Sequence, residues 1–449
     1  MSTLLLSDSL GRTLPRIFTR SRARAEKSAA EPLRGGNRPN ACTRFATLLL
    51  VLLAGASGGG CGNPAGTPGG SPGDPESAPP RRALWVLAEG HVRSLDAPER
   101  IPLLVERAQA LAATDLFVQV HRAGRAWYNS SYADAAPYHA VLDATGVDGL
   151  ALLLEEAHQA GLRVHAWVNV LSLARNREAP ILDRLGEQAV VADRWGRSLL
   201  DYPDYDVPFP DRRTLRMGSP SIYLDPALPG LAEDLAATYA ELLARYPTLD
   251  GLHLDYIRYP DVLPFSPGSR FGVGLDFGYG AASRERFLTE TGKTAPFGDS
   301  LGNANLWDEW RRARTTDLVA QIASEARAVK PDLEISAAVW MYANRAYLAL
   351  GQDWRGWLEA GLLDFAVPMT YTLDDRLLRY QVEHFAGLAQ GARIWPGLGI
   401  WLFSSDPQRA IAQLRILRES GVPGEALFSY DSIVAEPELF QVLVETPSP

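Results

Sequence analysis

The sequence predicts a (β/α)8 barrel, in which eight parallel strands each lead into a helix. From Arg81 onward, short apolar runs alternate with amphipathic stretches, which is the pattern of βα units. Eight such apolar runs can be counted, and the roughly 370 residues that contain them suit a TIM barrel with enlarged loops. A doubly wound parallel sheet is the structural alternative.

Each predicted strand is a short run rich in aliphatic and aromatic residues, and each predicted helix has a periodic apolar face. The predicted strands cover residues 83–89, 115–121, 163–169, 251–257, 333–340, 363–371, 394–400 and 426–431. The predicted helices cover residues 99–113, 148–161, 230–246, 304–330, 352–361, 376–390, 407–421 and 437–445. Extra length lies in residues 170–228 and 258–303, after the third and fourth strands. In a barrel these loops lie on the catalytic face, where insertions build a substrate cleft.

Asp255, in the segment LDGLHLDYIRYP, is the foremost candidate for a catalytic residue. Side chains alternate between the two faces of a strand, so His253 and Asp255 share one face while Leu252 and Leu254 share the other. With the leucines packed against helices, Asp255 points into the mouth of the barrel. Arg258 is close enough in sequence to orient this carboxylate or to neutralise substrate charge. The structural alternative is an aspartate that caps the next loop, which is the kind of role expected for Asp250 at the start of the strand.

The third strand, RVHAWVN, places His165, Trp167 and Asn169 on one face and three aliphatic residues on the other. The polar face is therefore predicted to be internal. Asn169, at the strand end, can hydrogen-bond a sugar hydroxyl, and Trp167 can stack on a sugar ring or fill the barrel. His165 is as consistent with a buried core histidine as with a binding residue, and His253 on the fourth strand is a further candidate for substrate binding.

Two further carboxylates follow strands, Glu89 after the first and Asp431 after the eighth. Either can pair with Asp255, because glycoside hydrolysis requires one group as acid and another as base or nucleophile. Each fits equally well as a helix cap or a loop anchor. Aromatic residues also gather at strand ends, where they can form platforms for sugar faces or simply pack; these are Trp127, Tyr128, Trp340, Tyr371 and Trp401.

Composition and charge exclude several classes of protein. Hydrophobic residues make up 46% and charged residues 22%, which are ordinary globular values. The chain has 44 Lys and Arg residues and 53 Asp and Glu residues. Nine of the basic and three of the acidic residues lie in the first 60 positions, so residues 61–449 hold 35 basic and 50 acidic residues and carry a net charge of −15. Such an acidic body is repelled by nucleic-acid phosphates and anionic lipid surfaces, so nucleic-acid binding is not expected. Neutral or cationic ligands suit it better.

The N-terminal region has the features of a bacterial export signal. Basic residues precede a short apolar run, residues 45–56, which is followed by small residues and Cys61. This run is too short to span a bilayer, which takes about 20 residues. A cysteine after small residues resembles a lipoprotein lipobox, although Gly58 stands where an aliphatic residue is usual. We therefore predict a leader and signal over residues 1–60, lipidation of Cys61, a Gly/Pro/Ser-rich tether over residues 61–80, and one folded domain over residues 81–449.

The body resembles the family-ten glycosyl-hydrolase-like proteins. The similarity rests on the segments ALWV, FVQVHRAGRAWYNSS, EEAHQAGLRVHAWVN, DGLHLDYIRYP and VPMTYT, of which HAWVN and DGLHLDYIRYP are the most specific. The resemblance implies a TIM barrel, bacterial export, often as a lipoprotein, and hydrolysis of glycosidic bonds in envelope or extracellular polysaccharide. It also makes Asp255 the catalytic carboxylate of the fourth strand. Many family members have a second Asp directly after it, where this chain has Tyr256.

These observations favour an exported glycoside hydrolase, anchored by lipid to the cell envelope and, if its host has one, to the outer membrane. Peptidoglycan glycan or another amino-sugar polymer is the favoured substrate, and no cofactor is expected. One alternative is a metal-dependent polysaccharide deacetylase, in which His121, His165 and His253 converge with Asp255 on a metal. The other is a glycan-binding lipoprotein without catalytic turnover.

Overall fold

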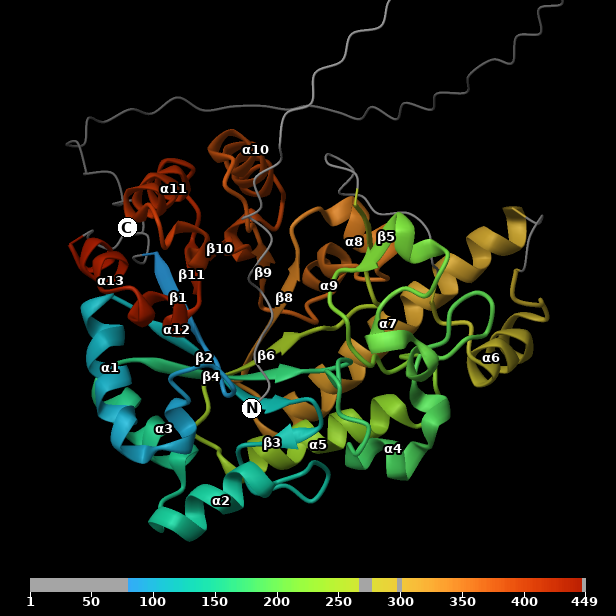
Figure 1. Ribbon diagram of the computed structural model, residues 1–449, viewed down its shortest axis with the longest axis horizontal. Coiled ribbons are helices and arrows are strands. Elements are labelled where there is room, and N and C mark those ends of the chain that lie inside the picture. Colours follow the sequence, from blue (N-terminus) through green and yellow to red (C-terminus); the bar gives the residue numbers. More distant parts are fainter. Residues whose placement is uncertain (1–79, 266–276, 297–300, 446–449) are drawn as a thin grey trace, which may run out of the picture. The chain divides into compact units, whose positions relative to one another are not determined.

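The computed structural model describes residues 80–265, 277–296 and 301–445, and within them eight parallel strands form a closed barrel (Figure 1). Neighbouring strands pair in parallel around the ring, and the pairing of β1 with β2 closes it. The predicted fold class is therefore confirmed. The barrel strands are β1 (Arg81–Val86), β2 (Asp115–Arg122), β4 (Arg163–Asn169), β6 (Gly251–Asp255), β8 (Glu334–Trp340), β9 (Phe365–Met369), β10 (Gly397–Gly399) and β11 (Gly424–Phe428).

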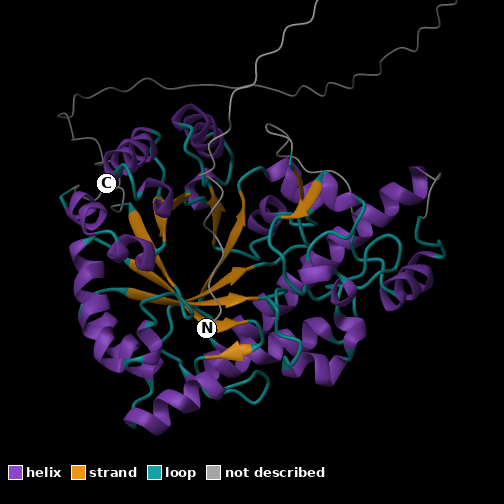
Figure 2. Ribbon diagram, viewed as in Figure 1, coloured by secondary structure: helices purple, strands orange, loops and turns teal. Residues whose placement is uncertain are grey.

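A helix follows every barrel strand, and the helices enclose the strands on the outside (Figure 2). The barrel helices are α1 (Ile101–Ala110), α3 (Gly149–Gln159), α5 (Leu231–Arg245), α7 (Leu301–Val329), α9 (Trp354–Glu359), α10 (Asp375–Ala386), α11 (Pro407–Glu419) and α13 (Pro437–Val444). The loops after strands add α2 (Ala136–Thr145), α4 (Pro180–Leu185), α6 (Ala281–Thr291), α8 (Ala343–Ala349), α12 (Tyr430–Ala435) and the short strand β3 (Arg125–Ala126). Among the described residues, no helix combines the length and the apolar character needed to cross a membrane.

Side-chain alternation along the strands separates two apolar cores. Outward residues such as Leu252 and Val164 pack with the surrounding helices in the main core. Inward residues form a second, smaller core inside the barrel, which includes Trp85, Phe117 and Trp167. The strand faces predicted from the sequence are thus the faces observed. Packed side chains fill this interior, as is usual for a barrel of eight strands.

Two long connections, after β4 and after β6, join to form a layer at one side of the barrel (Figure 1). The strand β5 (Leu215–Met217) from the first connection pairs antiparallel with β7 (Val262–Pro264) from the second. A small aromatic core supports the second connection, because Phe287 of α6 packs edge-on against Trp307 of α7. Strands β5 and β7 therefore hold the loop after Asp255 against the loop after Asn169.

An ionic cluster closes the N-terminal end of the barrel. Arg81 of β1 binds Asp115 of β2 and Glu334 of β8, with its Nη1 3.0 Å from the Glu334 Oε1. Nε2 of His165 lies 2.9 Å from Oδ1 of Asp115. Burial alone would raise the pKa of Asp115, but hydrogen bonds and charges from His165 and Arg81 outweigh it and hold that pKa well below its usual range. Four barrel strands are thereby tied together at one end.

We expect Arg81→Met to lower the free energy of unfolding by about 3–5 kcal/mol at pH 7, because the buried Asp115 loses one of the two cationic partners that hold it. The depressed pKa of Asp115 stabilises the fold above the pKa of an unfolded aspartate, about 3.9, and that contribution is lost as the pH falls. The difference between variant and wild type should therefore shrink below about pH 4. Urea unfolding at several pH values measures it.

The matched control is Arg245→Met, which removes an exposed ion pair with Glu241 on α5. Exposed pairs contribute about 0–1 kcal/mol, so this variant should unfold close to wild type. Equal losses in the two variants would show that Arg81 does not hold the barrel end together.

Candidate active site

Asp255 is the last residue of β6 and lies at the C-terminal end of the barrel, next to Asn169 of β4 in the strand register. The local sequence explains this position, since Leu252 and Leu254 are fully buried against the helices and leave the opposite face of the strand inside. Directly after Asp255 the chain turns sharply, because Tyr256 adopts a left-handed conformation with φ 54°. The strand thus ends at the carboxylate.

Three groups hold the Asp255 carboxylate. The backbone N–H of Tyr256 donates to Oδ1 at 2.7 Å, and the indole N–H of Trp167 donates to Oδ2 at 3.2 Å. The guanidinium of Arg258 lies 3.9 Å from Oδ1. Burial raises the pKa of Asp255, and the Arg258 charge and the two donors offset part of that rise. A buried carboxyl whose pKa is raised is suited to holding and transferring a proton.

The amide of Asn169 is held in place beside this carboxylate by a residue that the sequence analysis did not single out. Nε2 of Gln119 donates to Oδ1 of Asn169 at 3.3 Å, and both side chains are buried. Alternation along β2 places Gln119 inside the barrel, two residues after the inward Phe117 and opposite Trp167. The register shifts only between Gln119 and His121, and this shift turns His121 outward; it has no simple sequence signal, because it depends on how β2 pairs with β4.

Aromatic residues gather on the opposite side of the mouth, over β10. Burial, followed by the charge of Asp255, raises the pKa of Tyr371 well above its usual value, so this hydroxyl stays protonated beside the carboxylate. A Cβ on Gly399 would come within 3.1 Å of the Tyr371 ring and 3.2 Å of Nε1 of Trp401, so the glycine lets both rings approach the strand. Trp401, on the turn Ile400–Phe403, is 42% exposed. These two residues form an aromatic surface at the mouth, of the kind predicted for sugar faces.

The two other predicted carboxylates have different surroundings. Asp431 is buried at the start of α12 and accepts the backbone N–H of Val92 at 3.0 Å, so it anchors the loop after β1. Glu89 accepts from Arg122 at 2.8 Å and from Arg125 at 3.3 Å. The charge of Arg122 also lowers the pKa of Asp255. Since Arg122 binds Glu89 and its charge also acts on Asp255, Glu89 is the better candidate for a second acidic group.

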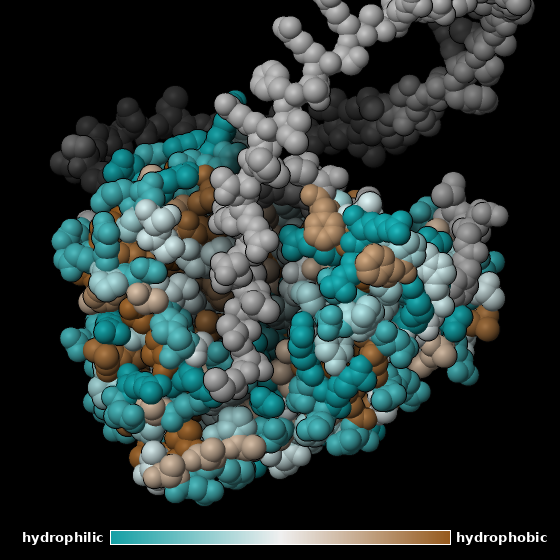
Figure 3. All heavy atoms as spheres, viewed as in Figure 1, coloured by the Kyte–Doolittle hydropathy of each residue, from teal (hydrophilic) through white to brown (hydrophobic). Residues whose placement is uncertain are grey.

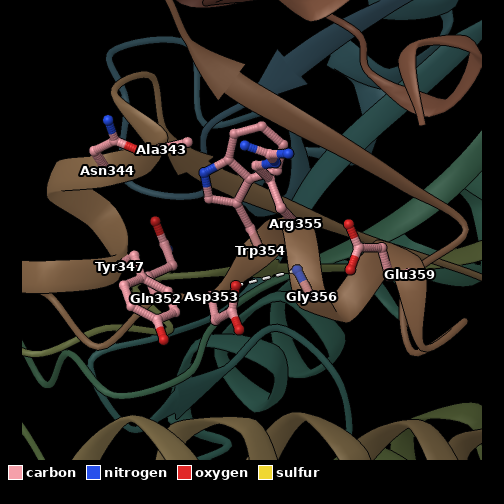
Figure 4. Close-up of a pocket in the computed structure, with 9 residues that line it drawn as sticks. All are labelled: Ala343, Asn344, Tyr347, Gln352, Asp353, Trp354, Arg355, Gly356 and Glu359. Atoms are coloured by element: carbon pink, nitrogen blue, oxygen red, sulfur yellow. Dashed lines mark hydrogen bonds between the residues drawn. The ribbon is translucent and has the colours of Figure 1, made fainter. Parts of the chain in front are cut away.

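Two cavities border this region. The larger, about 430 Å³, is lined by Glu89 and Trp127 together with charged residues of the loops after β1 and β2. The smaller, about 250 Å³, lies between α8 and α9 (Figure 4). There Asp353 caps α9 through the backbone N–H of Gly356 at 3.1 Å, which is the dashed line in the figure. Gln352 joins this cavity to the barrel, because its Oε1 accepts the backbone N–H of Trp340 at 2.8 Å.

The structure corrects the interpretation of His165 and His253 as substrate-binding residues, because both lie below the mouth of the barrel. His165 lies in the ionic cluster at the opposite end of the barrel, where the absence of a side chain on Gly251 makes room for its ring. His253 is fully buried at mid-barrel, where its Nε2 accepts from Trp85 at 3.0 Å and its Nδ1 donates to Ser336 at 2.8 Å. Alternation assigned the correct face to both histidines, but it carries no information on depth along the barrel.

The three histidines proposed for a metal do not converge. His121 packs edge-on against Tyr239 of α5, outside the barrel, while His165 and His253 occupy two depths within it. In the described part of the chain, the histidine and acidic side chains close enough to hold a metal are Asp115, His165 and Glu334. Arg81 already binds both of these carboxylates. This cluster fits an ion-pair network better than a metal centre.

Comparison with known families agrees with this geometry. The family model described as Glycosyl hydrolase-like 10 matches residues 80–385. The chain belongs to this family. Similar proteins include the glycosyl hydrolase DigH of Escherichia coli K12, 27% identical over 288 residues that cover 60% of this chain and 56% of DigH. The glycosyl hydrolase YngK of Bacillus subtilis is 24% identical over 319 residues, which cover 65% of this chain and 54% of YngK. The chain thus spans about half the length of these relatives.

Solved structures support the fold. The PgaB (BpsB) glycoside hydrolase domain from Bordetella bronchiseptica superposes with a TM-score of 0.57 at 17% identity, over 82% of this chain and 99% of that domain. The catalytic domain of a beta-amylase from Paenibacillus polymyxa gives a TM-score of 0.52 at 13% identity, over 82% and 99% of the two chains. At these identities the similarity establishes a shared barrel fold.

We expect Trp167→Phe to raise the pKa of Asp255 further, because it removes an N–H donor that stabilises the ionised carboxylate. A carbon-13 NMR titration of aspartate-labelled protein measures this pKa, with Asp255→Asn used to assign the signal. The control is Trp85→Phe, the same change at an inward tryptophan that donates to His253. If Asp255 titrates in Trp167→Phe as it does in wild type, the indole N–H of Trp167 does not stabilise the ionised carboxylate.

Proposed function

We propose that this protein is an exported glycoside hydrolase that cleaves glycosidic bonds in a bacterial envelope or extracellular polysaccharide. The observation that carries the proposal is Asp255, a buried carboxyl with a raised pKa at the catalytic end of a barrel whose family is glycosyl hydrolase-like. An oxocarbenium-like transition state requires a carboxyl group to protonate, attack or stabilise the scissile centre. Asn169, Tyr371 and Trp401 supply a polar group and an aromatic surface for sugar rings around it.

A second acidic group is required for a two-carboxylate mechanism, and Glu89 is our candidate. Arg122 contacts Glu89 and lowers the pKa of Asp255, so one guanidinium influences both acids. In this arrangement Glu89 acts as base or nucleophile, and the buried Asp255, whose pKa is raised, acts as acid. The distance between the two carboxyl groups in a substrate complex then decides the stereochemical outcome, about 5–5.5 Å for retention and about 6.5–9.5 Å for inversion.

A glycan-binding protein without turnover is the second candidate function. This function is favoured because both candidates for the second catalytic acid already have partners in the fold. Asp431 anchors a loop, and Glu89 is paired with two arginines. The metal-dependent deacetylase is the weaker alternative, because its three histidines lie apart. Within the hydrolase proposal, peptidoglycan glycan or another amino-sugar polymer is the favoured substrate, because a lipid-anchored protein meets such polymers at the envelope.

We expect Asp255→Asn to reduce turnover by about 10²- to 10⁴-fold, the range for loss of general acid–base catalysis, while glycan binding and the melting temperature stay close to wild type. Release of reducing ends from peptidoglycan glycan strands, poly-N-acetylglucosamine and neutral glucans measures turnover. The control is Asp250→Asn, the same change next to the opposite end of β6, where the carboxylate binds His158 and the Val164 N–H. Wild-type binding without cleavage of any glycan would favour the binding protein.

We also expect maturation at Cys61, which lies outside the residues that the structure describes. Labelled fatty acid should enter wild type and Cys42→Ser but not Cys61→Ser, because Cys61 follows the apolar run and the small residues of the signal. Fractionation of the host envelope then locates the protein, in the outer membrane if there is one. Equal labelling of Cys61→Ser and wild type would exclude this anchor.

A further inference from the structure

A chain of hydrogen bonds runs from the loop after β1 through Gln119 to Asn169 at the mouth of the barrel. The backbone N–H of Ala88 donates to Oε1 of Gln119 at 3.4 Å, and Nε2 of Gln119 donates to Oδ1 of Asn169 at 3.3 Å. All three residues are buried, the most exposed being Asn169 at 4%. Asn169 lies opposite Asp255 in the register of β4 and β6. We call Ala88, Gln119 and Asn169 the amide chain.

The first donor of the amide chain fixes the direction of the bonds that follow. A backbone N–H can only donate, so Gln119 must turn its oxygen towards Ala88. The nitrogen of Gln119 also can only donate, so it faces Asn169 and requires the oxygen of that amide. A backbone group therefore decides which atom of each side-chain amide is oxygen and which is nitrogen.

This direction leaves the nitrogen of Asn169 as the free end of the amide chain. Within the residues that the structure describes, Gln119 is the only hydrogen-bond partner of the Asn169 side chain, and it binds Oδ1. Nδ2 is not one of the described side-chain atoms that are buried without a partner, so it still reaches solvent. Both of its hydrogens are therefore available to a bound molecule.

Two other donors near Asp255 are used within the protein. The N–H groups of Trp167 and Tyr256 both donate to its carboxylate. Asn169 differs from them, because Gln119 takes only its oxygen. The amide chain thus keeps a fixed donor next to the Asp255 carboxyl, where it needs no reorganisation when substrate binds.

We infer that Gln119 is a positioning residue, which holds the Asn169 amide so that its N–H donors are directed to the substrate. This inference rests on the proposed function and extends it to a group that determines specificity. The sugar bound next to Asp255 must offer an oxygen that accepts from Asn169, such as a hydroxyl, ether or carbonyl oxygen. An ammonium group at the same place would set donor against donor.

A double-mutant cycle tests whether Gln119 acts through Asn169. The full chain carrying Asp255→Asn is titrated by calorimetry with peptidoglycan glycan strands, poly-N-acetylglucosamine and a neutral glucan, and the cycle uses whichever binds most tightly. We expect Asn169→Leu and Gln119→Met each to weaken its binding by about 3- to 10-fold, the effect of one oriented hydrogen bond. In the Asn169→Leu background, Gln119→Met should change the affinity by less than about 2-fold, because the group through which it acts is gone.

The matched control is Gln413→Met, the same change at a buried glutamine of α11. Nε2 of Gln413 donates at 2.9 Å to the backbone carbonyl of Thr372 and to Asp375. This variant should bind glycan as the Asp255→Asn parent does. Additive losses for Gln119→Met and Asn169→Leu would show that Gln119 supports only the fold, and would overturn the inference.

Exchange of side-chain amide hydrogens with solvent tests the direction of the amide chain in wild type. The protein is labelled with nitrogen-15 at asparagine and glutamine, and Gln119→Met and Asn169→Leu assign the two amides by NMR. We expect slow exchange at Gln119, which donates within the protein, and faster exchange at Asn169. The reverse order would overturn the inference. If Gln119→Met does not fold, protection of the Asn169 hydrogens alone decides the outcome.

Hydrolysis by wild type separates this inference from the proposed function. Cleavage of a glycan by wild type, together with additive losses in the cycle, would sustain the hydrolase and overturn the role of Gln119. Non-additive losses without cleavage of any glycan would sustain that role and overturn the hydrolase. Failure of all three glycans to bind would overturn both.

Discussion

The closed barrel depends on a filled interior, and most of the remaining structure follows from how that interior is divided along its axis. At one end Arg81 links Asp115 and Glu334, so that strands far apart in the sequence are joined by charge. Rings of Trp85, Phe117 and His253 fill the middle, with Phe117 stacked on His253 at 4.1 Å. The N-terminal end and the middle of the barrel are thus filled by side chains that bind one another. Only the C-terminal end is left for a reactive carboxylate, which explains why Asp255 lies where the packing stops.

The environment of Asp255 depends on the loops as much as on the barrel. Trp167 reaches it from the neighbouring strand, whereas Tyr256 and Arg258 belong to the loop that follows. That loop continues into β7, which pairs with β5, so its course is set by a second insertion. Hydrophilic residues cover much of this side of the protein (Figure 3), consistent with a layer whose inner face supports a site and whose outer face meets solvent. The insertions therefore shape the substrate-facing chemistry and leave the barrel intact.

Charge is distributed unevenly in this protein, and its local arrangement matters more than its total. A body with a net charge of −15 contains, at the mouth, the buried Arg258, 3.9 Å from the Asp255 carboxylate. The same residue type makes close ion pairs in the barrel end, where Arg81 binds two carboxylates. Because electrostatic interactions act over a few ångströms at physiological salt, these two environments are independent. One joins the strands at the N-terminal end of the barrel, and the other surrounds the Asp255 carboxylate.

The sequence by itself determined the succession of strands and helices, the inward faces of β4 and β6 and the position of Asp255 at a strand end, because periodicity and strand ends are local properties. It predicted the barrel, but only the pairing of β1 with β2 decided between a closed barrel and an open sheet. It could not decide depth, so it could not separate His165 and His253, which lie below the mouth, from substrate-binding residues. Nor could it place His121, which a register shift after Gln119 turns outward, or choose between anchor and acid for Asp431. It also left open the direction of the Asn169 amide, which a backbone N–H of the loop after β1 sets through Gln119. Tertiary structure decided these points, because depth, register and hydrogen bonds between distant residues arise only when separate strands are placed side by side.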